Sequence, residues 1–178
     1  MSLATLNDIF YTLVERGSDR VMLQRQAIQW VPISARELYR NVSGVARALQ
    51  SWGVTRGDRI AILSENRPEW TTADFACQLI GAISVPIYST LTAEQTAFIL
   101  RDAECRAVFV SSDAQLRKVQ SIQPQTPVKK LVVMDGIETA HAISMSHMMH
   151  AGSQDRDTEL DRSARAIGGD DLATIIYT

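Results

Sequence analysis

The sequence lacks the features that mark several protein classes. Among its 178 residues only Cys77 and Cys105 are cysteines, too few for a disulfide framework and without the spacing of a metal site. No stretch approaches the ~18 consecutive apolar residues that span a membrane. Residues 1–10 carry no basic stretch ahead of an apolar run, so we expect no signal peptide. These absences favour a protein of the reducing cytoplasm without a transmembrane segment.

A strong excess of charge of one sign is also missing. The 18 Lys and Arg residues nearly balance the 20 Asp and Glu residues, which gives a net charge of −2. Such a weak field does not hold a polyanion, so we expect no nucleic-acid partner. The hydrophobic fraction of 46% and the charged fraction of 21% are typical of a globular chain of one domain, or one and a fraction.

Apolar periodicity predicts a regular alternation of strands and helices from residue 59 onward. Short apolar strands are expected at residues 59–63, 83–88, 107–110 and 128–134, with amphipathic helices between them. Asn66 and Asp113 are predicted to cap the first and last of these helices, while Thr92 and Gln95 have capping-box spacing. The alternation implies right-handed crossovers, and therefore an α/β fold with a parallel sheet flanked by helices.

The chain divides into four predicted segments. Residues 1–53 are expected to hold a helix at 5–16, a strand pair around Val21 and Trp30, and a second helix closed by Gly53. Residues 54–135 form the parallel α/β core. Residues 136–170 are a long, mostly polar connection with one helix around residues 143–149, and residues 171–178 are a final apolar strand.

No complete catalytic or phosphate-binding motif is visible in this pattern. The residues that follow the strand at 59–63 include no glycine, and no P-loop motif occurs, which argues against a dinucleotide site. His147 and His150 could share a helix face, but no third metal ligand is indicated, so we interpret them as surface or packing residues. Asp135 is interpreted as a turn residue and Cys77 as a small buried hydrophobe.

Several ordered stretches nevertheless resemble the N-terminal part of an AMP-forming acyl-CoA synthetase, of the adenylate-forming superfamily. They are Trp30 and residues 33–39, 53–54, 57–63, 66–70, 81–82, 85–88 and 171–178. Their order and spacing are similar to those of the family over most of the chain from about residue 21. The resemblance implies the first α/β subdomain of an adenylate-forming enzyme, truncated. Tyr88, followed by Ser89 and Thr90, is similar to the long-chain fatty acid enzymes.

The resemblance also implies a reaction and its cofactors. In the family a carboxylate and ATP give acyl-adenylate and pyrophosphate, with magnesium, and the thiol of CoA then displaces AMP. A glycine- and hydroxyl-rich loop that holds the ATP phosphates follows a Tyr-Thr pair, so only Tyr177 and Thr178 carry over as ligand-binding residues. The remaining catalytic motifs of the family follow Thr178, so we expect no ligase activity from this chain alone.

Two functions therefore stay open at the level of the sequence. The first is the scaffold portion of a long-chain fatty acid CoA ligase, with self-association through the unpaired edge of the final strand. The alternative is a stand-alone, non-catalytic α/β module that binds a protein or small-molecule partner. Asn66, Trp70 and Tyr88 match signature positions of the family, but capping and core packing explain these residues as well.

Overall fold

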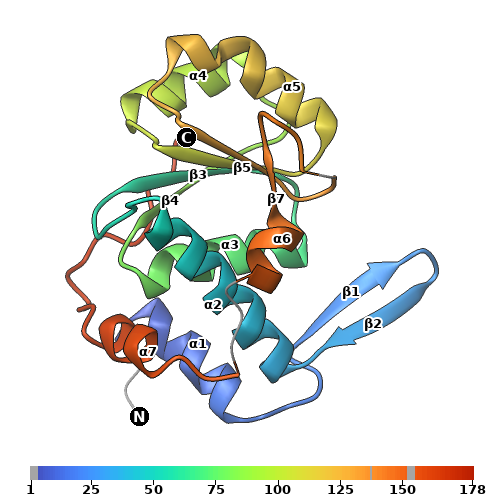
Figure 1. The fold of residues 1–178 in the computed structure, drawn as a ribbon, viewed down its shortest axis with the longest axis vertical. Coiled ribbons are helices and arrows are strands. Elements are labelled where there is room, and N and C mark those ends of the chain that lie inside the picture. The colour runs from blue at the N-terminus through green and yellow to red at the C-terminus, as the bar shows by residue number, and fades with distance from the viewer. Residues whose placement is uncertain (1–3, 137, 152–154) are drawn as a thin grey trace.

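The computed structural model describes residues 4–136, 138–151 and 155–178. Its main sheet is parallel, has the strand order β4-β3-β5-β6-β7 and crosses the middle of the molecule (Figure 1). This confirms the parallel α/β class. The strands are β3 (Arg59–Leu63), β4 (Ile83–Ile87), β5 (Ala107–Val110), β6 (Lys130–Val133) and β7 (Ile143–Ser144).

Helices cover both faces of the sheet. On one face lie α2, α3 and α6, and on the other lie α4 and α5 (Figure 1). Alternate residues of β3 pack on opposite faces of the sheet. Ile60 and Ile62 belong to one apolar cluster, and Ala61 and Leu63 belong to the other. A continuous apolar strand is thus buried on both sides. The helices are α2 (Ala35–Ser51), α3 (Pro68–Leu79), α4 (Ala93–Asp102), α5 (Asp113–Ile122) and α6 (Met145–Ala151).

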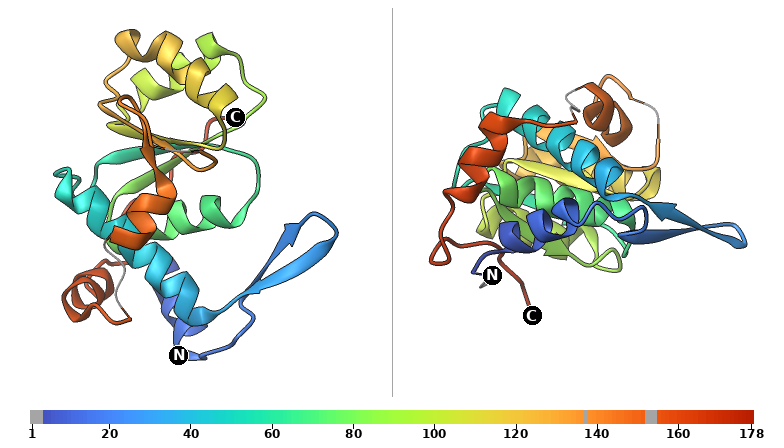
Figure 2. Two further views of the ribbon diagram at one scale, coloured as in Figure 1. Left: turned by 45° about the vertical axis from the view of Figure 1, so that its right-hand side comes forward. Right: turned by 90° about the horizontal axis from the view of Figure 1, so that it is seen from below.

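The N-terminal segment adds a helix and a hairpin. The helix α1 (Leu6–Glu15) begins with a complete capping box between Thr5 and Asp8. The strands β1 (Met22–Gln26) and β2 (Gln29–Ile33) pair with each other in antiparallel register and with no other strand. This ribbon projects away from the body of the molecule (Figure 2). Both the helix at 5–16 and the strand pair were predicted correctly.

Two predicted caps are wrong by one residue. The N-cap of α3 is Arg67 and not Asn66, because the residue before Pro68 is pushed into the extended conformation that an N-cap adopts. The N-cap of α5 is Ser112, whose hydroxyl accepts from the backbone N–H of Gln115, so Asp113 becomes the first helical residue. By contrast, the predicted capping box at the start of α4 is confirmed.

The described residues of the segment at 136–170 form more regular structure than its polarity predicts. The expected helix is α6, but β7 precedes it and adds a fifth strand beside β6. A further helix, α7 (Thr158–Arg165), packs against α1 and α3. The sequence hides α7 because only Leu160 and Ala164 form its buried apolar stripe among charged neighbours.

The predicted final strand at 171–178 does not form. One parallel bridge joins Thr174 to Ser84 of β4, with Ser84 donating to the carbonyl of Ala173 and accepting from Ile175. The next β4 residue that faces this edge is Pro86, which has no N–H to continue the ladder. The pairing therefore stops after one bridge. Across the described residues, no helix combines the length and the apolar character needed to cross a membrane.

Candidate functional site

The strand order indicates where a ligand site is expected. From β3 the chain passes through α3 to β4, which lies on one side of β3. From β4 it passes through α4 to β5, which lies on the other side of β3, and α3 and α4 cover opposite faces of the sheet. The crevice between the carboxyl ends of β3 and β5 is therefore the switch point at which open α/β sheets bind ligands. Residues 64–67 and 111–112 flank this crevice.

Arg67, which follows β3, contacts residues that follow β5 and β6. Its Nη2 and Nη1 donate to the two carboxylate oxygens of Asp135 at 2.6 and 2.9 Å, and Nη1 also donates to the carbonyl of Ser111 at 3.2 Å. Its Nε donates to Glu69 at 2.8 Å. The guanidinium holds the pKa of Asp135 below its usual value. Asp135 is thus more than the turn residue predicted from sequence, because it joins the loops after β3 and β6.

Polar groups also fix the loop after β4. The amide of Gln115 and the ammonium of Lys118 both donate to the carbonyl of Ser89, each at 3.0 Å. The pKa of Glu65 is lowered by its own backbone N–H first, and then by the hydroxyls of Ser111 and Ser89. Glu65, an exposed residue that follows β3, is therefore an anion at neutral pH.

An open groove of about 660 Å³ adjoins this edge. It lies between the hairpin and the start of α3, and residues 22–25, Trp30, residues 65–68 and Thr71 line it. Trp30 and Asn66, two positions that carry the family resemblance, thus come together on one surface. Trp70 packs against the core instead, and Tyr88 is 70% exposed at the end of β4.

The two predicted ligand-binding residues lie elsewhere. The hydroxyl of Tyr177 donates to Asp102 at 2.6 Å, and its ring meets that of Phe98 edge-on. Burial, together with the Asp102 carboxylate, raises the pKa of Tyr177 to about 12. Asp102 is the last residue of α4. The first residues of this helix follow the carboxyl end of β4, so Asp102 and Tyr177 lie toward the opposite edge of the sheet from the groove. Thr178 is exposed.

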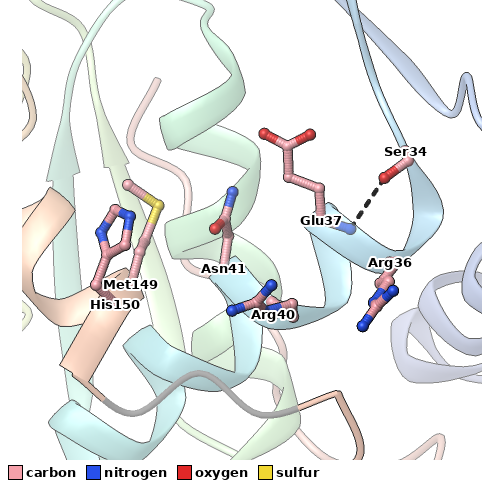
Figure 3. A pocket seen from close by; sticks show the side chains of 7 residues that line it. All are labelled: Ser34, Arg36, Glu37, Arg40, Asn41, Met149 and His150. Carbon is pink, nitrogen blue, oxygen red and sulfur yellow. Dashed lines mark hydrogen bonds between the residues drawn. The ribbon is translucent and has the colours of Figure 1, made fainter.

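A second hollow, of about 460 Å³, lies between the start of α2 and α6 (Figure 3). His150 and Met149 face Arg40, Asn41 and Glu37 across it. The other histidine of α6, His147, contacts Glu138 instead. Over the described ranges, no three His, Cys, Asp or Glu side chains are grouped to hold a metal ion.

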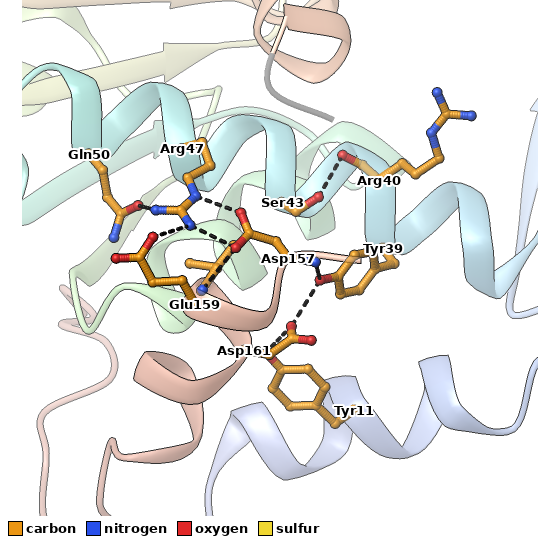
Figure 4. A network of polar contacts seen from close by, with 10 residues as sticks. Tyr11, Tyr39, Arg40, Ser43, Arg47, Gln50, Asp157, Glu159 and Asp161 are labelled. Atoms are coloured by element: carbon orange, nitrogen blue, oxygen red, sulfur yellow. Dashed lines mark hydrogen bonds and ion pairs between the residues drawn. The ribbon is translucent and has the colours of Figure 1, made fainter. Parts of the chain in front are cut away.

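A buried network of hydrogen bonds and ion pairs joins α7 to α1 and α2 (Figure 4). Asp161 accepts from the hydroxyls of Tyr11 and Tyr39 at 2.8 and 2.9 Å, and the backbone N–H of Asp157 donates to Tyr39 at 2.7 Å. Arg47 holds the Asp157 carboxylate with two bonds, at 2.6 and 2.7 Å. The second carboxylate oxygen of Asp161 forms an ion pair with Arg156 at 3.0 Å. These contacts join three helices, so we interpret the network as structural.

Neither cysteine is a candidate nucleophile. Both are free and fully buried. Burial raises the pKa of the Cys105 thiol to about 12 and also raises the pKa of Cys77, so both stay protonated at neutral pH.

Comparison with known proteins decides the family. The family model described as "AMP-binding enzyme" matches residues 10–178. The chain belongs to this family. The match confirms the resemblance of the sequence to adenylate-forming enzymes. The residues that line the groove and the tail at 171–178 lie within the matched range.

Individual relatives indicate which members of the family this chain is similar to. The long-chain-fatty-acid–CoA ligase FadD15 of Mycobacterium tuberculosis is 32% identical over 149 residues, which cover 84% of this chain and 24% of the relative. The long-chain-fatty-acid–CoA ligase ACSBG2 of Xenopus laevis is 26% identical over 179 residues, covering 98% of this chain and 24% of the relative. The chain thus spans about a quarter of the length of these relatives.

Solved structures show the same fold. A Mycobacterium tuberculosis fatty acyl CoA synthetase superposes with a TM-score of 0.77 at 21% identity, over 98% of this chain and 32% of that chain. The N-terminal domain of FACL13 from the same organism gives 0.77 at 20% identity, over 100% of this chain and 42% of that domain. At these identities the likeness concerns the fold alone.

Proposed function

We propose that this chain is the leading scaffold portion of an ATP-dependent, AMP-forming CoA ligase for long-chain fatty acids. The observation that carries the proposal is the family match over residues 10–178, together with relatives named as long-chain-fatty-acid–CoA ligases. The superposition on a domain named as N-terminal supports the leading position. The substrates of the whole protein would be a fatty acid, ATP and CoA, in the cytoplasm.

The proposed reaction has two steps. A carboxylate oxygen of the fatty acid attacks the α-phosphorus of ATP, and the bond to pyrophosphate breaks. The sulfur of CoA then attacks the acyl carbon, and AMP leaves with the electrons of the broken acyl–oxygen bond. Both steps need groups that stabilise charge on phosphate oxygens. We assign those groups, and the residues that hold magnesium, to a part of the enzyme outside this chain.

In this proposal the chain contributes shape and rigidity. The Arg67–Asp135 ion pair and the contacts of Lys118 and Gln115 hold the loops at the carboxyl edge of the sheet, which would form one wall of the active-site cleft. Tyr177 and Thr178 would lead into the phosphate-binding loop. For them to do so, the Tyr177–Asp102 hydrogen bond would be exchanged for contacts with that loop.

The proposal is tested with two proteins. The chain alone is titrated with magnesium-ATP in a calorimeter and assayed for acyl-CoA formation from palmitate, ATP and CoA; we expect neither sub-millimolar binding nor turnover. The protein encoded by the continued reading frame should form acyl-CoA only when ATP is present. Unaided turnover by the chain would refute the scaffold assignment, and an extended protein that prefers aromatic acids would refute the substrate class.

We also propose that the chain alone self-associates beside β4. The tail, which meets β4 at Ser84, exposes Leu172 and Ile176, at 58% and 62%. Phe98 of α4, which contacts Tyr177 of the tail, is 54% exposed. Light scattering should show a mass that rises with concentration. A clean monomer, with the tail protected from hydrogen exchange, would contradict this proposal.

A further inference from the structure

Side chains reinforce the attachment of the tail to β4. The backbone N–H of Ser84 donates to the carbonyl of Ala173 at 3.1 Å, and the N–H of Ile175 donates to the carbonyl of Ser84 at 3.0 Å. The hydroxyl of Thr174 also donates to the carbonyl of Ser84, at 3.0 Å. The side-chain amide of Gln78 donates to the carbonyl of Ala173, again at 3.0 Å. Both carbonyls therefore accept from two donors at once.

Gln78 reaches the tail from α3, and its surroundings hold it firmly. The residue is 6% exposed. Its own backbone carbonyl accepts from the side chain of Asn7 at 3.1 Å, and Asn7 also donates to the carbonyl of Ala164 at 3.0 Å. Helices α1, α3 and α7 thus meet at the residue that contacts the tail.

Asp74, one turn earlier on α3, orients the amide of Gln78. The amide nitrogen carries two N–H donors, and its two acceptors are the carbonyl of Ala173 and, at 3.5 Å, Oδ1 of Asp74. Turning the amide by half a rotation would place its oxygen against two other oxygens, so only the observed orientation is favourable. Burial raises the pKa of Asp74, and the side chains of Ser84 and Gln78 oppose the rise.

We propose that Gln78, oriented by Asp74, is a positioning residue for ATP in the ligase reaction. This role rests on the proposed function, in which Tyr177 and Thr178 lead into the phosphate-binding loop. Ala173 lies four residues before Tyr177, so its register on β4 sets where the loop begins. A tail that holds this register only part of the time binds ATP more weakly by the same fraction. Gln78 acts through the tail and touches no substrate.

Amide hydrogen exchange of the 178-residue chain, resolved by NMR, tests the attachment. In Gln78→Leu the amides of Ser84 and Ile175 should exchange roughly three- to tenfold faster than in the parent chain, as expected for the loss of one hydrogen bond. The amide of Arg106, which donates to the carbonyl of Arg59 at 3.0 Å elsewhere in the sheet, should exchange at about the parent rate. Circular dichroism checks that each variant is folded.

Two matched comparisons separate positioning from general stability. Asp74→Asn keeps an oxygen acceptor for Gln78 and should retain most of the protection of the tail, whereas Asp74→Leu should speed exchange at the same two amides. Gln120→Leu makes the same chemical change on α5, which covers the opposite face of the sheet from α3 (Figure 1), and should leave the exchange of the tail unchanged.

The protein encoded by the continued reading frame gives the functional readout. Gln78→Leu should raise the KM for ATP about three- to tenfold and leave the KM for CoA unchanged, because the proposed loop holds ATP alone. Unchanged exchange at the two amides, equally faster exchange at Arg106, or an unchanged KM for ATP would overturn the positioning role and leave the proposed function standing. An extended protein that forms no acyl-CoA would refute the proposed function and the positioning role together.

Discussion

Gly44 offers the sharpest test of the packing, because it lies in α2 where α6 crosses closely. A Cβ at this position would stand 2.5 Å from the carbonyl oxygen of Met149 and 2.9 Å from that of Met148, well inside van der Waals contact. Both atoms are backbone, so no side-chain rotation relieves the overlap. Gly44→Ala must therefore move one helix away from the other.

Two opposing contributions decide how Gly44→Ala changes the free energy of unfolding. In an open helix, replacing glycine by alanine gains about 1 kcal/mol. Here overpacking costs ~1–3 kcal/mol, and displacement of α6 would uncover part of the fully buried Met145, whose complete burial is worth roughly 1.5–3 kcal/mol. The net expectation for Gly44→Ala is a loss of about 2 kcal/mol in the free energy of unfolding.

Urea unfolding followed by circular dichroism measures this loss by linear extrapolation. The control is Gly168→Ala, because its Cβ would meet nothing closer than a carboxylate oxygen of Asp171 at 3.8 Å. That variant should differ from the parent chain by no more than about 0.5 kcal/mol. A Gly44→Ala variant as stable as the parent, or more stable, would refute the close crossing of α2 and α6.

Three further predictions concern other contacts. Arg47 lowers the pKa of Asp157, so this pair stabilises the fold above the ordinary Asp pKa and loses its effect as the pH falls through the depressed value. Asp157→Asn should therefore lower the free energy of unfolding at pH 7 but hardly at about pH 2; an equal loss at both pH values would contradict the ion pair. Tyr39→Phe removes the hydroxyl that links Asp161 to the backbone of α7, and should cost ~1–3 kcal/mol in urea unfolding; no change would mean that the network is open in solution. Ile176→Asp should shift the concentration-dependent mass toward monomer in light scattering, and an unchanged mass would locate self-association elsewhere.

Much of the sheet could be predicted because burial on both faces leaves a simple signal. The strands at 59–63 and 107–110 agree with β3 and β5 residue for residue, since each is a short apolar run with no polar interruption. Helix ends were predicted less accurately. At α5, Ser112 and Asp113 are both capping residues, and the sequence alone does not decide which of two adjacent side chains accepts the bond.

The helix α7 could not be predicted because its stability comes from distant partners. Half of its eight residues are charged, and two of its anchors, Asp157 at the N-cap and Asp161, are carboxylates that look like surface residues in isolation. Their partners Arg47, Tyr11 and Tyr39 lie 110 to 150 residues away along the chain. The apolar and polar residues of α7 do lie on opposite faces, but the apolar face holds only Leu160 and Ala164, so the periodic signal is short and easily missed.

The contacts of the candidate site also could not be predicted from the sequence. Arg67 and Asp135 are 68 residues apart, and only the parallel order of β3, β5 and β6 brings their loops to one edge. A final strand was predicted at 171–178, but Pro86 lacks the N–H that would continue its pairing with β4, and Tyr177 contacts Asp102 instead. Beyond the single bridge, side-chain contacts hold the tail: Gln78 donates to the carbonyl of Ala173 and the hydroxyl of Thr174 donates to the carbonyl of Ser84, each at 3.0 Å. The same proline that ends the backbone ladder therefore leaves the last residues to be held by side-chain contacts, which the sequence pattern of a strand does not predict.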